Sequence, residues 1–315
     1  MKLKTILNTN RKMEKRIIVK VAAGLGNQMF MYAHAMALAK KLNCKLYIDD
    51  TSGYFQKKNR TLGRVYRLNL LEIRATTIED KYKYDNYFTH FVKKLLKFLD
   101  RFKFKKSFLN EHENLKKLTF FKKNKTSFSD QIYIEGYFES EKYFLDYRKN
   151  LIQEFGVKSK FIDKNNKYIK MLEDSNSVSI HVRRNRFVEP KIFSDRGTQP
   201  KKNINLDDIF DYIHKSITFF KSTIENPKFF IWSNNFIDLE KIFDKKKFVF
   251  IENNNTIMDF YLFNYAKHFI VNPSTFHWWG AWLNTNHRKI CVRPPDFLNP
   301  SNNINFWPDG WKKID

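Results

Sequence analysis

Two adjacent arginines follow a short apolar stretch in the second half of the chain. Residues 177–182 have the composition of a buried strand, and Arg183 and Arg184 come directly after His181 and Val182. Guanidinium groups carry forked donors that match phosphate oxygens, and an arginine pair at the end of an apolar strand is poorly placed as a solvated surface feature. We interpret Arg183 and Arg184 as a clamp for a diphosphate. An ion pair with a neighbouring carboxylate is the alternative.

A turn before a predicted helix is a second candidate phosphate site. Residues 268–271 read as a strand, and Ser274, Thr275 and Phe276 follow it at the start of a helical stretch. A Ser or Thr cap leaves the first helical amides pointing at a ligand, and amides at the positive end of a helix bind phosphate well. Tryptophans at positions 278, 279 and 282 continue at helical spacing, which favours core packing over a sugar platform.

A pair of glycines near the start of the chain is the third candidate. Gly24 and Gly26 follow a predicted strand at 16–21, and Asn27 and Gln28 open the next helix. The pattern matches the start of a dinucleotide-binding turn, but the third glycine of that pattern is missing. Taken alone, the pair is equally well explained as a tight turn that lets the backbone approach a helix.

The elements that must position these loops alternate between strand and helix. In the first half we predict strands at 16–21, 45–48 and 131–137 and a helix at 28–42. In the second half we predict strands at 177–182, 228–232, 247–251, 268–271 and 289–292, and helices at 207–223, 237–243, 256–266 and 274–283. Such alternation is typical of α/β proteins with parallel sheets, in which ligands bind beyond the carboxyl ends of the strands. A polar stretch at 163–176 separates the halves.

Residues 81–130 differ from the rest of the chain and are predicted to form a basic helical insertion. Phe91, Leu95, Phe98, Leu99 and Phe102 recur at helical spacing, with several lysines among them. An ordinary helix would pack this apolar stripe on its own domain. The alternative is a basic amphipathic surface that contacts an anionic membrane.

Composition limits the classes of protein that fit. The chain has 315 residues and a net charge of +25, which attracts polyanions such as nucleic acid, anionic lipid or phosphorylated substrates. No nucleic-acid module, P-loop, Asp-x-Asp pair or Cys/His cluster occurs in the sequence. We therefore expect a diphosphate held without a metal and no nucleic-acid partner. The polar start, the two scattered cysteines and the lack of a long apolar run favour the cytoplasm, with peripheral contact at the inner membrane face left open.

Four blocks of sequence, in order, resemble the α-1,2-fucosyltransferases of glycosyltransferase family eleven. They lie at residues 24–33, 135–144, 178–184 and 268–283, and include Gly-Leu-Gly-Asn-Gln-Met-Phe, Glu-Gly-Tyr-Phe-Glu-Ser, Ser-Ile-His-Val-Arg-Arg and Ser-Thr-Phe-x-Trp-Trp-Gly-Ala-Trp. The resemblance implies a GT-B-like α/β fold, with two Rossmann-type domains whose parallel sheets face each other across a cleft. We place an acceptor-side domain at 16–165, a nucleotide-sugar-binding domain at 175–295 and a tail at 296–315.

The resemblance also implies a reaction: inverting transfer of L-fucose from GDP-β-L-fucose to the 2-hydroxyl of a galactose in an oligosaccharide or a lipid-linked glycan. Arg183 and Arg184 would neutralise the departing GDP. The remaining donor contacts would come from Gly24, Gly26, Asn27, Gln28, His181, Asn234, Asn235, Ser274, Thr275 and Phe276.

Three departures from the family pattern leave alternatives open. Asn185-Arg186 replaces Gly-Asp, Asn234-Asn235 replaces a pair of aspartates near the expected base pocket, and Pro273 and His277 flank the Ser-Thr-Phe turn. A different nucleotide-sugar donor, a different acceptor or an inactive binding homologue would also fit. The general base is left open, with Glu135, Glu189 and Asp195 as candidates.

Overall fold

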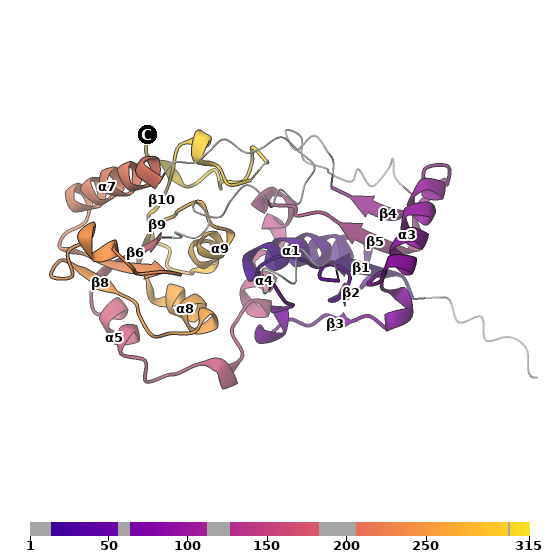
Figure 1. The fold of residues 1–315 in the computed structure, drawn as a ribbon, viewed down its shortest axis with the longest axis horizontal. Helices are drawn as coiled ribbons and strands as arrows, with labels where there is room; N and C mark the ends of the chain where they lie inside the picture. The colour runs from indigo at the N-terminus through magenta and orange to yellow at the C-terminus, as the bar shows by residue number, and fades with distance from the viewer. Residues whose placement is uncertain (1–13, 56–63, 112–126, 183–205, 302) are drawn as a thin grey trace, which may run out of the picture.

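The chain folds into two lobes, each built around a parallel β-sheet. The structure is a computed structural model, and it describes residues 14–55, 64–111, 127–182, 206–301 and 303–315. Within these residues the first sheet has five strands and the second has six, and every strand pairing in both sheets is parallel. Figure 1 shows the two lobes side by side. The predicted α/β class with two parallel sheets is confirmed.

The first sheet has the strand order β3-β2-β1-β5-β4. Its strands are β1 (Arg16–Lys20), β2 (Lys45–Asp49), β3 (Thr76–Thr77), β4 (Lys105–Asn110) and β5 (Ser127–Glu135). Helix α1 (Leu25–Leu42) connects β1 to β2 and is buried along most of its length, from Leu25 to Ala39. Ile17 and Val19 face α1, whereas Ile18 and Tyr133 face the other side of the sheet, because side chains alternate along a strand.

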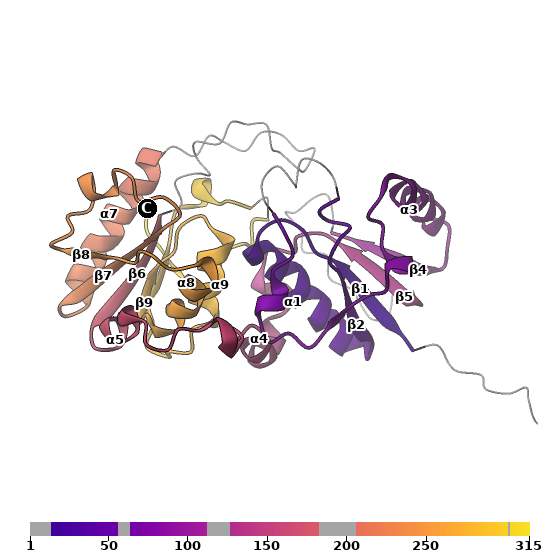
Figure 2. The ribbon, with the colours of Figure 1, turned by 60° about the horizontal axis from the view of Figure 1, so that its bottom comes forward.

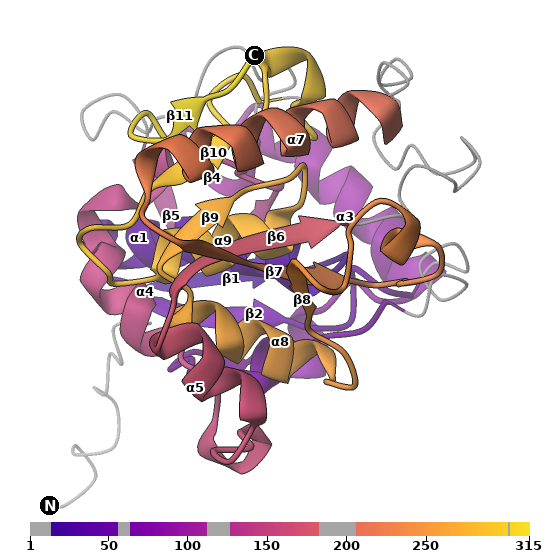
Figure 3. The same cartoon turned by 90° about the vertical axis from the view of Figure 1, so that its left-hand side faces the viewer.

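The second sheet has the order β11-β10-β9-β6-β7-β8. Its strands are β6 (Asn176–Val182), β7 (Pro227–Ser233), β8 (Phe248–Phe250), β9 (His268–Ile270), β10 (Cys291–Arg293) and β11 (Lys312–Lys313). Helix α7 (Leu206–Thr223) covers one face, and helices α8 (Thr256–Leu262) and α9 (Thr275–Leu283) lie on the other (Figure 3). Helices α4 (Arg148–Glu154) and α5 (Lys167–Glu173) lie on the path between the two sheets.

An aromatic cluster joins the lobes where α1 meets α9. The ring of Phe30 lies 4.6 Å from that of Trp278 and 4.8 Å from that of Trp279, and Phe144 stacks on Trp279 at 5.3 Å between ring centroids. The Trp279 indole donates a hydrogen bond to the Gly26 carbonyl at 2.9 Å. The predicted core role of Trp278, Trp279 and Trp282 is therefore confirmed, and Figure 2 shows α1 and α9 side by side at the junction.

Three sequence predictions differ from the structure. The helix predicted at 237–243 is a single 3-10 turn, Leu239–Lys241, because Asp238 adopts a left-handed conformation with φ of 62°. The insertion at 81–130 contains helix α3 (Tyr87–Asp100), but it also contributes strand β4 to the first sheet. The segment at 296–315 carries strand β11, and Phe306 and Trp307 are buried in the shared core, so it is not a loose tail.

The apolar stripe of α3 does not pack on its own domain, so that interpretation is wrong. Phe91, Leu95 and Phe98 are each at least half exposed, and the buried residues of the helix are Lys93 and Asp100. Among the described residues, no helix is both long and apolar enough to cross a bilayer. The domain boundary predicted between 165 and 175 falls on helix α5 and stays a prediction.

Candidate active site

Three loops meet at the carboxyl edge of the second sheet. The Asn272 side-chain amide, after β9, donates a hydrogen bond to the His181 carbonyl at the end of β6, at 2.5 Å. The Ser233 hydroxyl, at the end of β7, donates to the Val182 carbonyl at 2.7 Å. The ends of β6, β7 and β9 are thus tied together at the edge where parallel sheets bind ligands.

The turn after β9 presents a buried hydroxyl at the start of α9. Ser274 occupies the N-cap position and is fully buried, but its side chain makes no capping bond to the helix. Its Oγ has no hydrogen-bond partner among the described residues. A buried polar group without a partner costs about 1–3 kcal/mol, so such groups persist where a ligand satisfies them. The hydroxyl and the first amides of α9 together form a donor set suited to phosphate.

The glycine loop of the first lobe lies directly against this turn. A Cβ atom on Gly26 would lie 2.6 Å from the Thr275 carbonyl carbon and 2.7 Å from the Phe276 nitrogen. Any side chain at position 26 would push α1 and α9 apart, so the close approach requires glycine. At Gly24 a Cβ would meet nothing within 4 Å. Two loops that are about 250 positions apart in the chain are therefore brought together.

The two residues after Gly26 have different environments. Gln28 is fully buried, and its amide nitrogen donates to the carbonyls of Ala23 and Val65, each at 2.9 Å. Its side-chain oxygen accepts from the Arg67 backbone N–H at 2.9 Å. These contacts make Gln28 a residue that holds the loop in place. Asn27 is half-buried, and its predicted donor contact stays a prediction.

Two histidines line the space behind the turn. The ring of His181 lies 6.0 Å from that of Phe276 and 5.5 Å from that of His277. His277, one of the departures from the family pattern, is fully buried, and its Nε2 lies 2.9 Å from Ser179 Oγ. Burial holds the pKa of His277 well below its usual range, and His181 adds to that shift. His277 therefore acts as a neutral packing residue beneath the His181 ring.

Several predicted residues lie outside the described ranges. Arg183, Arg184, Glu189 and Asp195 fall in this category, as do the departures Asn185 and Arg186. Since β6 ends at Val182, the arginine pair comes directly after the strand end to which the Asn272 side chain is bonded. Their role as a diphosphate clamp stays a prediction.

The segments after β7 and β8, where the base pocket is expected, carry two amides and one carboxylate that the sequence reasoning missed. Asn234 is exposed, and the Asn235 side-chain oxygen accepts the Ile237 N–H at 2.9 Å. Asp259 lies in the first turn of α8, and its Oδ1 is buried without a partner among the described residues. Burial raises the pKa of Asp259 to about 6, and Asn254 opposes that shift. The signal in the sequence was a lone acid in an otherwise apolar stretch.

Asp259 belongs to the same region as the Ser274 turn. Helix α8 follows β8 and therefore begins at the carboxyl edge of the parallel sheet. Phe260, the next residue, packs on Phe276 with ring centroids 5.4 Å apart. A carboxylate in this position can accept two N–H donors from a flat ligand such as a purine base.

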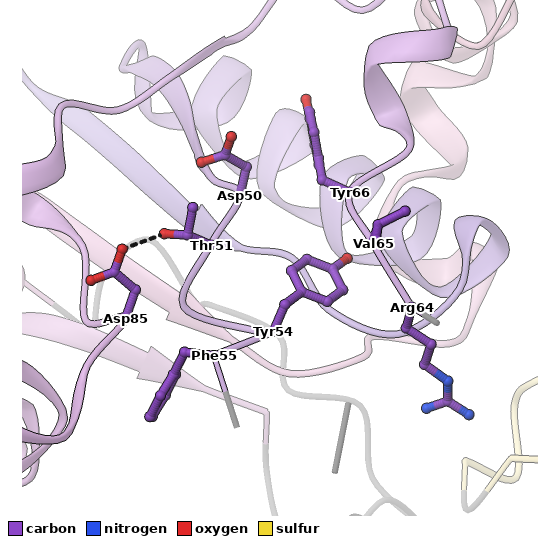
Figure 4. A pocket seen from close by; sticks show the side chains of 8 residues that line it. All are labelled: Asp50, Thr51, Tyr54, Phe55, Arg64, Val65, Tyr66 and Asp85. Atoms are coloured by element: carbon purple, nitrogen blue, oxygen red, sulfur yellow. Dashed lines mark hydrogen bonds between the residues drawn. The ribbon is translucent and has the colours of Figure 1, made fainter. Parts of the chain in front are cut away.

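The first lobe holds a pocket of about 490 Å³ beside the glycine loop (Figure 4). It is lined by Asp50, Thr51, Tyr54, Phe55, Arg64, Val65, Tyr66 and Asp85. The Tyr54 hydroxyl donates a hydrogen bond to the Ala23 carbonyl at 3.5 Å, and the Val65 carbonyl accepts one from the Gln28 side-chain amide. The pocket therefore adjoins the loop. Aromatic rings together with carboxylates suit a sugar, because rings stack on its C–H faces while carboxylates accept hydrogen bonds from its hydroxyls.

The carboxylates near this lobe differ in what surrounds them. Asp50 lies 2.9 Å from the Lys83 ammonium, whereas Asp85 accepts a hydrogen bond from the Thr51 hydroxyl at 2.9 Å. Glu135, a predicted base, contacts Lys20 at 2.7 Å, Lys93 at 2.8 Å and also Lys97. Burial alone would raise the pKa of Glu135, but the three lysines hold it well below its usual range. Such a carboxylate is a poor proton acceptor.

Metal ligands were not expected at this site. Within the ranges that the structure describes, no group of three or more His, Cys, Asp or Glu side chains is arranged to hold a metal ion. Helix amides and guanidinium groups would then have to stabilise the charge of a bound diphosphate. That the reaction needs no metal stays a prediction.

Comparison with known proteins gives a consistent family. A model of glycosyl transferase family 11 matches residues 5–297. An alpha-1,2-colitosyltransferase of Escherichia coli is 29% identical over 95% of this chain and 99% of its own length. The O-antigen biosynthesis glycosyltransferase WbnK of Escherichia coli is 27% identical over 92% of this chain and 98% of its own.

A solved structure has the same fold. The NodZ alpha-1,6-fucosyltransferase co-crystallized with GDP aligns with a TM-score of 0.50 and 12% identity, over 85% of this chain and 91% of that one. The two-sheet, GT-B-like architecture implied by the sequence resemblance is thereby confirmed.

Proposed function

The chain belongs to glycosyltransferase family 11, and from this premise we propose that it transfers L-fucose from GDP-β-L-fucose to the 2-hydroxyl of a galactose. The acceptor would be a surface glycan or its lipid-linked precursor. The observation that carries the proposal is the contact between the Gly26 loop of one lobe and the Ser274 turn of the other, next to the end of β6. This contact supports the proposal because it brings together two of the sequence blocks that carry the family resemblance.

The diphosphate has a natural place in this arrangement. The Ser274 hydroxyl and the free amides at the start of α9 would donate to its oxygens, and Arg183 and Arg184 would complete the clamp from the end of β6. Charge that builds on the leaving GDP in the transition state would thereby be stabilised, which is a large term in catalysis of this kind.

The guanine base would be read by Asp259. The sequence departs from the family pattern at Asn234 and Asn235, where carboxylates were expected. Asp259 supplies a carboxylate on the same edge of the sheet, and within the part of the chain that the structure describes its buried Oδ1 has no hydrogen-bond partner. An ionised carboxylate matches the N1–H and 2-amino donors of guanine and would leave these donors unmatched in a pyrimidine nucleotide.

The acceptor galactose would occupy the pocket beside Tyr54 and Tyr66. In an inverting transfer the acceptor hydroxyl attacks the anomeric carbon from the face opposite the diphosphate, and a carboxylate takes its proton. We assign this role to Asp85, because Asp50 is neutralised by Lys83 and Glu135 by three lysines. Glu189 and Asp195 remain alternatives.

GDP-colitose is an alternative donor that should be compared directly with GDP-fucose. One relative, at 29% identity, is an alpha-1,2-colitosyltransferase, and colitose is L-fucose without its 3-hydroxyl group. A difference of one hydroxyl leaves the GDP and the reacting carbon unchanged, so GDP-colitose fits the same clamp. Selectivity between the two donors would therefore depend only on the residues that face the 3-hydroxyl group.

The test is a donor panel followed by linkage analysis of the product. We would incubate the full chain with GDP-fucose or GDP-colitose and β-galactosides, and determine the product by NMR. The proposal predicts an α-1,2-fucosyl galactoside, with GDP-fucose used more efficiently. Preference for GDP-colitose would establish the alternative donor. If the protein neither transfers nor hydrolyses either donor, it is an inactive homologue.

A further inference from the structure

Helix α3 packs on its lobe through polar side chains. The Lys93 ammonium, almost fully buried, reaches the Glu135 carboxylate at 2.8 Å, and Lys97 contacts the same carboxylate. The buried Asp100 carboxylate accepts the backbone N–H groups of Ser107 at 2.9 Å and Phe108 at 3.2 Å. These bonds fix the orientation of the helix about its own axis. They reverse the usual arrangement, in which an amphipathic helix buries its apolar face.

The opposite face of α3 is apolar and exposed. Phe88 is 75% exposed, Phe91 66% and Phe102, just past the end of the helix, 77%. Leu95, Phe98 and Leu99 continue the same stripe, which spans an arc of roughly 120° around the helix. Figure 1 shows α3 at the end of the molecule farthest from the second lobe, and Figure 2 agrees. Contiguous exposed apolar patches of this kind mark an interaction surface.

The charges around the stripe indicate what it contacts. Lys94 is exposed on the helix, and Arg101, Lys103 and Lys105 are exposed just beyond its end; the only acidic residue of the helix, Asp100, is buried. A second copy of this chain would bring two surfaces of a +25 protein together, which is electrostatically unfavourable. An anionic lipid surface offers hydrocarbon for the stripe and negative headgroups for the flanking cations. Since α3 has 14 residues and is held on one side, it would lie in the interface and not span it.

The stripe begins beside the pocket assigned to the acceptor. Phe55, a pocket residue, packs edge-on against Tyr87 at 5.9 Å between ring centroids, and lies 5.5 Å from His90. Asp85 lies two residues before the helix. A lipid surface against α3 would therefore lie close to the pocket entrance. A glycan attached to a membrane lipid could then enter the pocket while its lipid stays in the bilayer.

We propose that α3 docks the protein on an anionic membrane and that its acceptor is lipid-linked; the second half of this inference rests on the proposed function. The test uses the full chain and the double variant Phe91→Glu/Phe98→Glu, whose positions are exposed and should tolerate charge. Ile237→Glu, at an exposed position on the second lobe, is the matched control. Binding to vesicles of phosphatidylglycerol or of phosphatidylcholine is measured by co-sedimentation.

Docking predicts that the wild type and Ile237→Glu bind phosphatidylglycerol vesicles about tenfold or more tightly than phosphatidylcholine, and that the double variant loses this binding. Equal binding by the double variant would overturn the proposal. So would a concentration-dependent dimer, seen by analytical ultracentrifugation, that the double variant abolishes, because the stripe would then serve a second copy.

A second measurement separates this proposal from the proposed function. Transfer is measured to a soluble β-galactoside and to an alkyl β-galactoside embedded in phosphatidylglycerol vesicles. The double variant should keep its rate on the soluble acceptor and lose about tenfold on the embedded one. An unchanged ratio of the two rates would refute the lipid-linked acceptor. If the wild type transfers to neither acceptor, the proposed function is contradicted instead. Membrane docking is then tested by the vesicle-binding measurement alone.

Discussion

The alpha carbon of Gly26 faces the backbone of Thr275 so closely that a methyl group there would lie 2.6 Å from the Thr275 carbonyl carbon. Gly26 opens the first helix of one lobe, and Thr275 opens the helix beneath the Ser274 turn of the other. Trp279 donates to the Gly26 carbonyl from the same helix. The start of α9 therefore packs directly against the first lobe, which places the candidate diphosphate site at the junction.

Gly26→Ala should lower both stability and donor affinity. The added methyl meets backbone atoms, which cannot move aside as a flexible side chain would, so we expect a loss of about 1–3 kcal/mol in the free energy of unfolding. The displaced turn should also raise the KM for GDP-fucose. Thermal unfolding and donor kinetics measure the two effects. Gly310→Ala is the control, since a Cβ there meets nothing within 4 Å. Wild-type stability in Gly26→Ala would mean that the lobes separate more easily than the contact implies.

Ser274→Ala should weaken GDP binding without destabilising the fold. The hydroxyl is buried without a partner among the described residues, so its removal relieves a cost in the unliganded protein. In the complex it would donate to a charged phosphate, and its loss should reduce affinity about 10- to 100-fold, as measured by calorimetry.

Ser216→Ala provides the matched control for that substitution. This buried serine on α7 donates to the Tyr212 carbonyl at 2.8 Å, in the core on the face of the second sheet opposite α9. Its loss should lower the melting temperature and leave GDP affinity unchanged. If Ser274→Ala binds GDP as the wild type does, the hydroxyl faces something other than the diphosphate.

Donor affinity should fall as the pH drops through about 6. Burial raises the pKa of Asp259 to about 6, so the carboxylate that would accept guanine donors is ionised above that pH and protonated below it. GDP-fucose is the appropriate probe because its diphosphate, esterified at both ends, does not titrate in this range. Asp259→Asn should bind about tenfold more weakly at pH 8 and lose the pH dependence.

The same substitution has a second, opposite consequence. Because the folded-state pKa of Asp259 lies above the ordinary value of 3.8, this group favours the folded state less above pH 6 than below pH 3.8. Asp259→Asn should therefore raise the melting temperature of the unliganded protein at pH 8, whereas Asp208→Asn on the exposed turn of α7 should not. The ratio of the affinities for GDP and for inosine diphosphate, which lacks the 2-amino group, should be smaller in Asp259→Asn than in the wild type. An equal ratio in the two proteins would mean that guanine does not bind at Asp259.

Glu135→Gln and Asp85→Asn should have contrasting effects. Since its pKa is held low, Glu135 contributes stability that is present above its ordinary pKa and lost as the pH falls through the folded-state value. Removing its charge leaves three lysines without a carboxylate partner among the described residues and should cost about 3–5 kcal/mol in unfolding free energy, while kcat changes little. Asp85→Asn should instead lower kcat about 10²- to 10⁴-fold at unchanged donor affinity.

Asp80→Asn is the surface control for this pair, because Asp80 is almost fully exposed beside Lys83. Steady-state kinetics and thermal unfolding of the three variants distinguish the roles. A large fall in kcat for Glu135→Gln with a normal melting temperature would restore Glu135 as the base and exclude Asp85.

Sequence reasoning identified most of the fold because its elements follow strong local patterns. The strand around Val178 and the helices around Ala33 and Trp279 all lie where alternation and helical spacing place them. Strand β11 was missed because Lys312 and Lys313 have no apolar signal, and it exists through pairing with Val292 and Arg293. The exposed stripe of α3 was misread because the groups that bury its polar side chains show no local pattern: Glu135, which pairs with Lys93, comes 42 positions later, and the N–H groups that bind Asp100 belong to strand β4, which was not predicted.

The site was predictable to the extent that it follows motifs. Gly26, His181 and Ser274 lie in blocks that the sequence marks, and the structure places their loops in contact, whereas their role in donor binding stays a prediction. Asp259 and Asp85 were missed, because a single acid has meaning only when its neighbours in space are known. Conversely, Gln28 and Glu135 looked available for chemistry, but their polar atoms are bonded within the protein.

The most direct test of the central claim is a crystal structure of the complex with GDP. We predict diphosphate oxygens at about 3 Å from Ser274 Oγ and from the first amides of α9, between the Gly26 loop and the end of β6, with Arg183 or Arg184 against them. A diphosphate bound elsewhere, for example beside Asp50 and Asp85, or a Ser274 hydroxyl that makes no contact with it, would contradict the account.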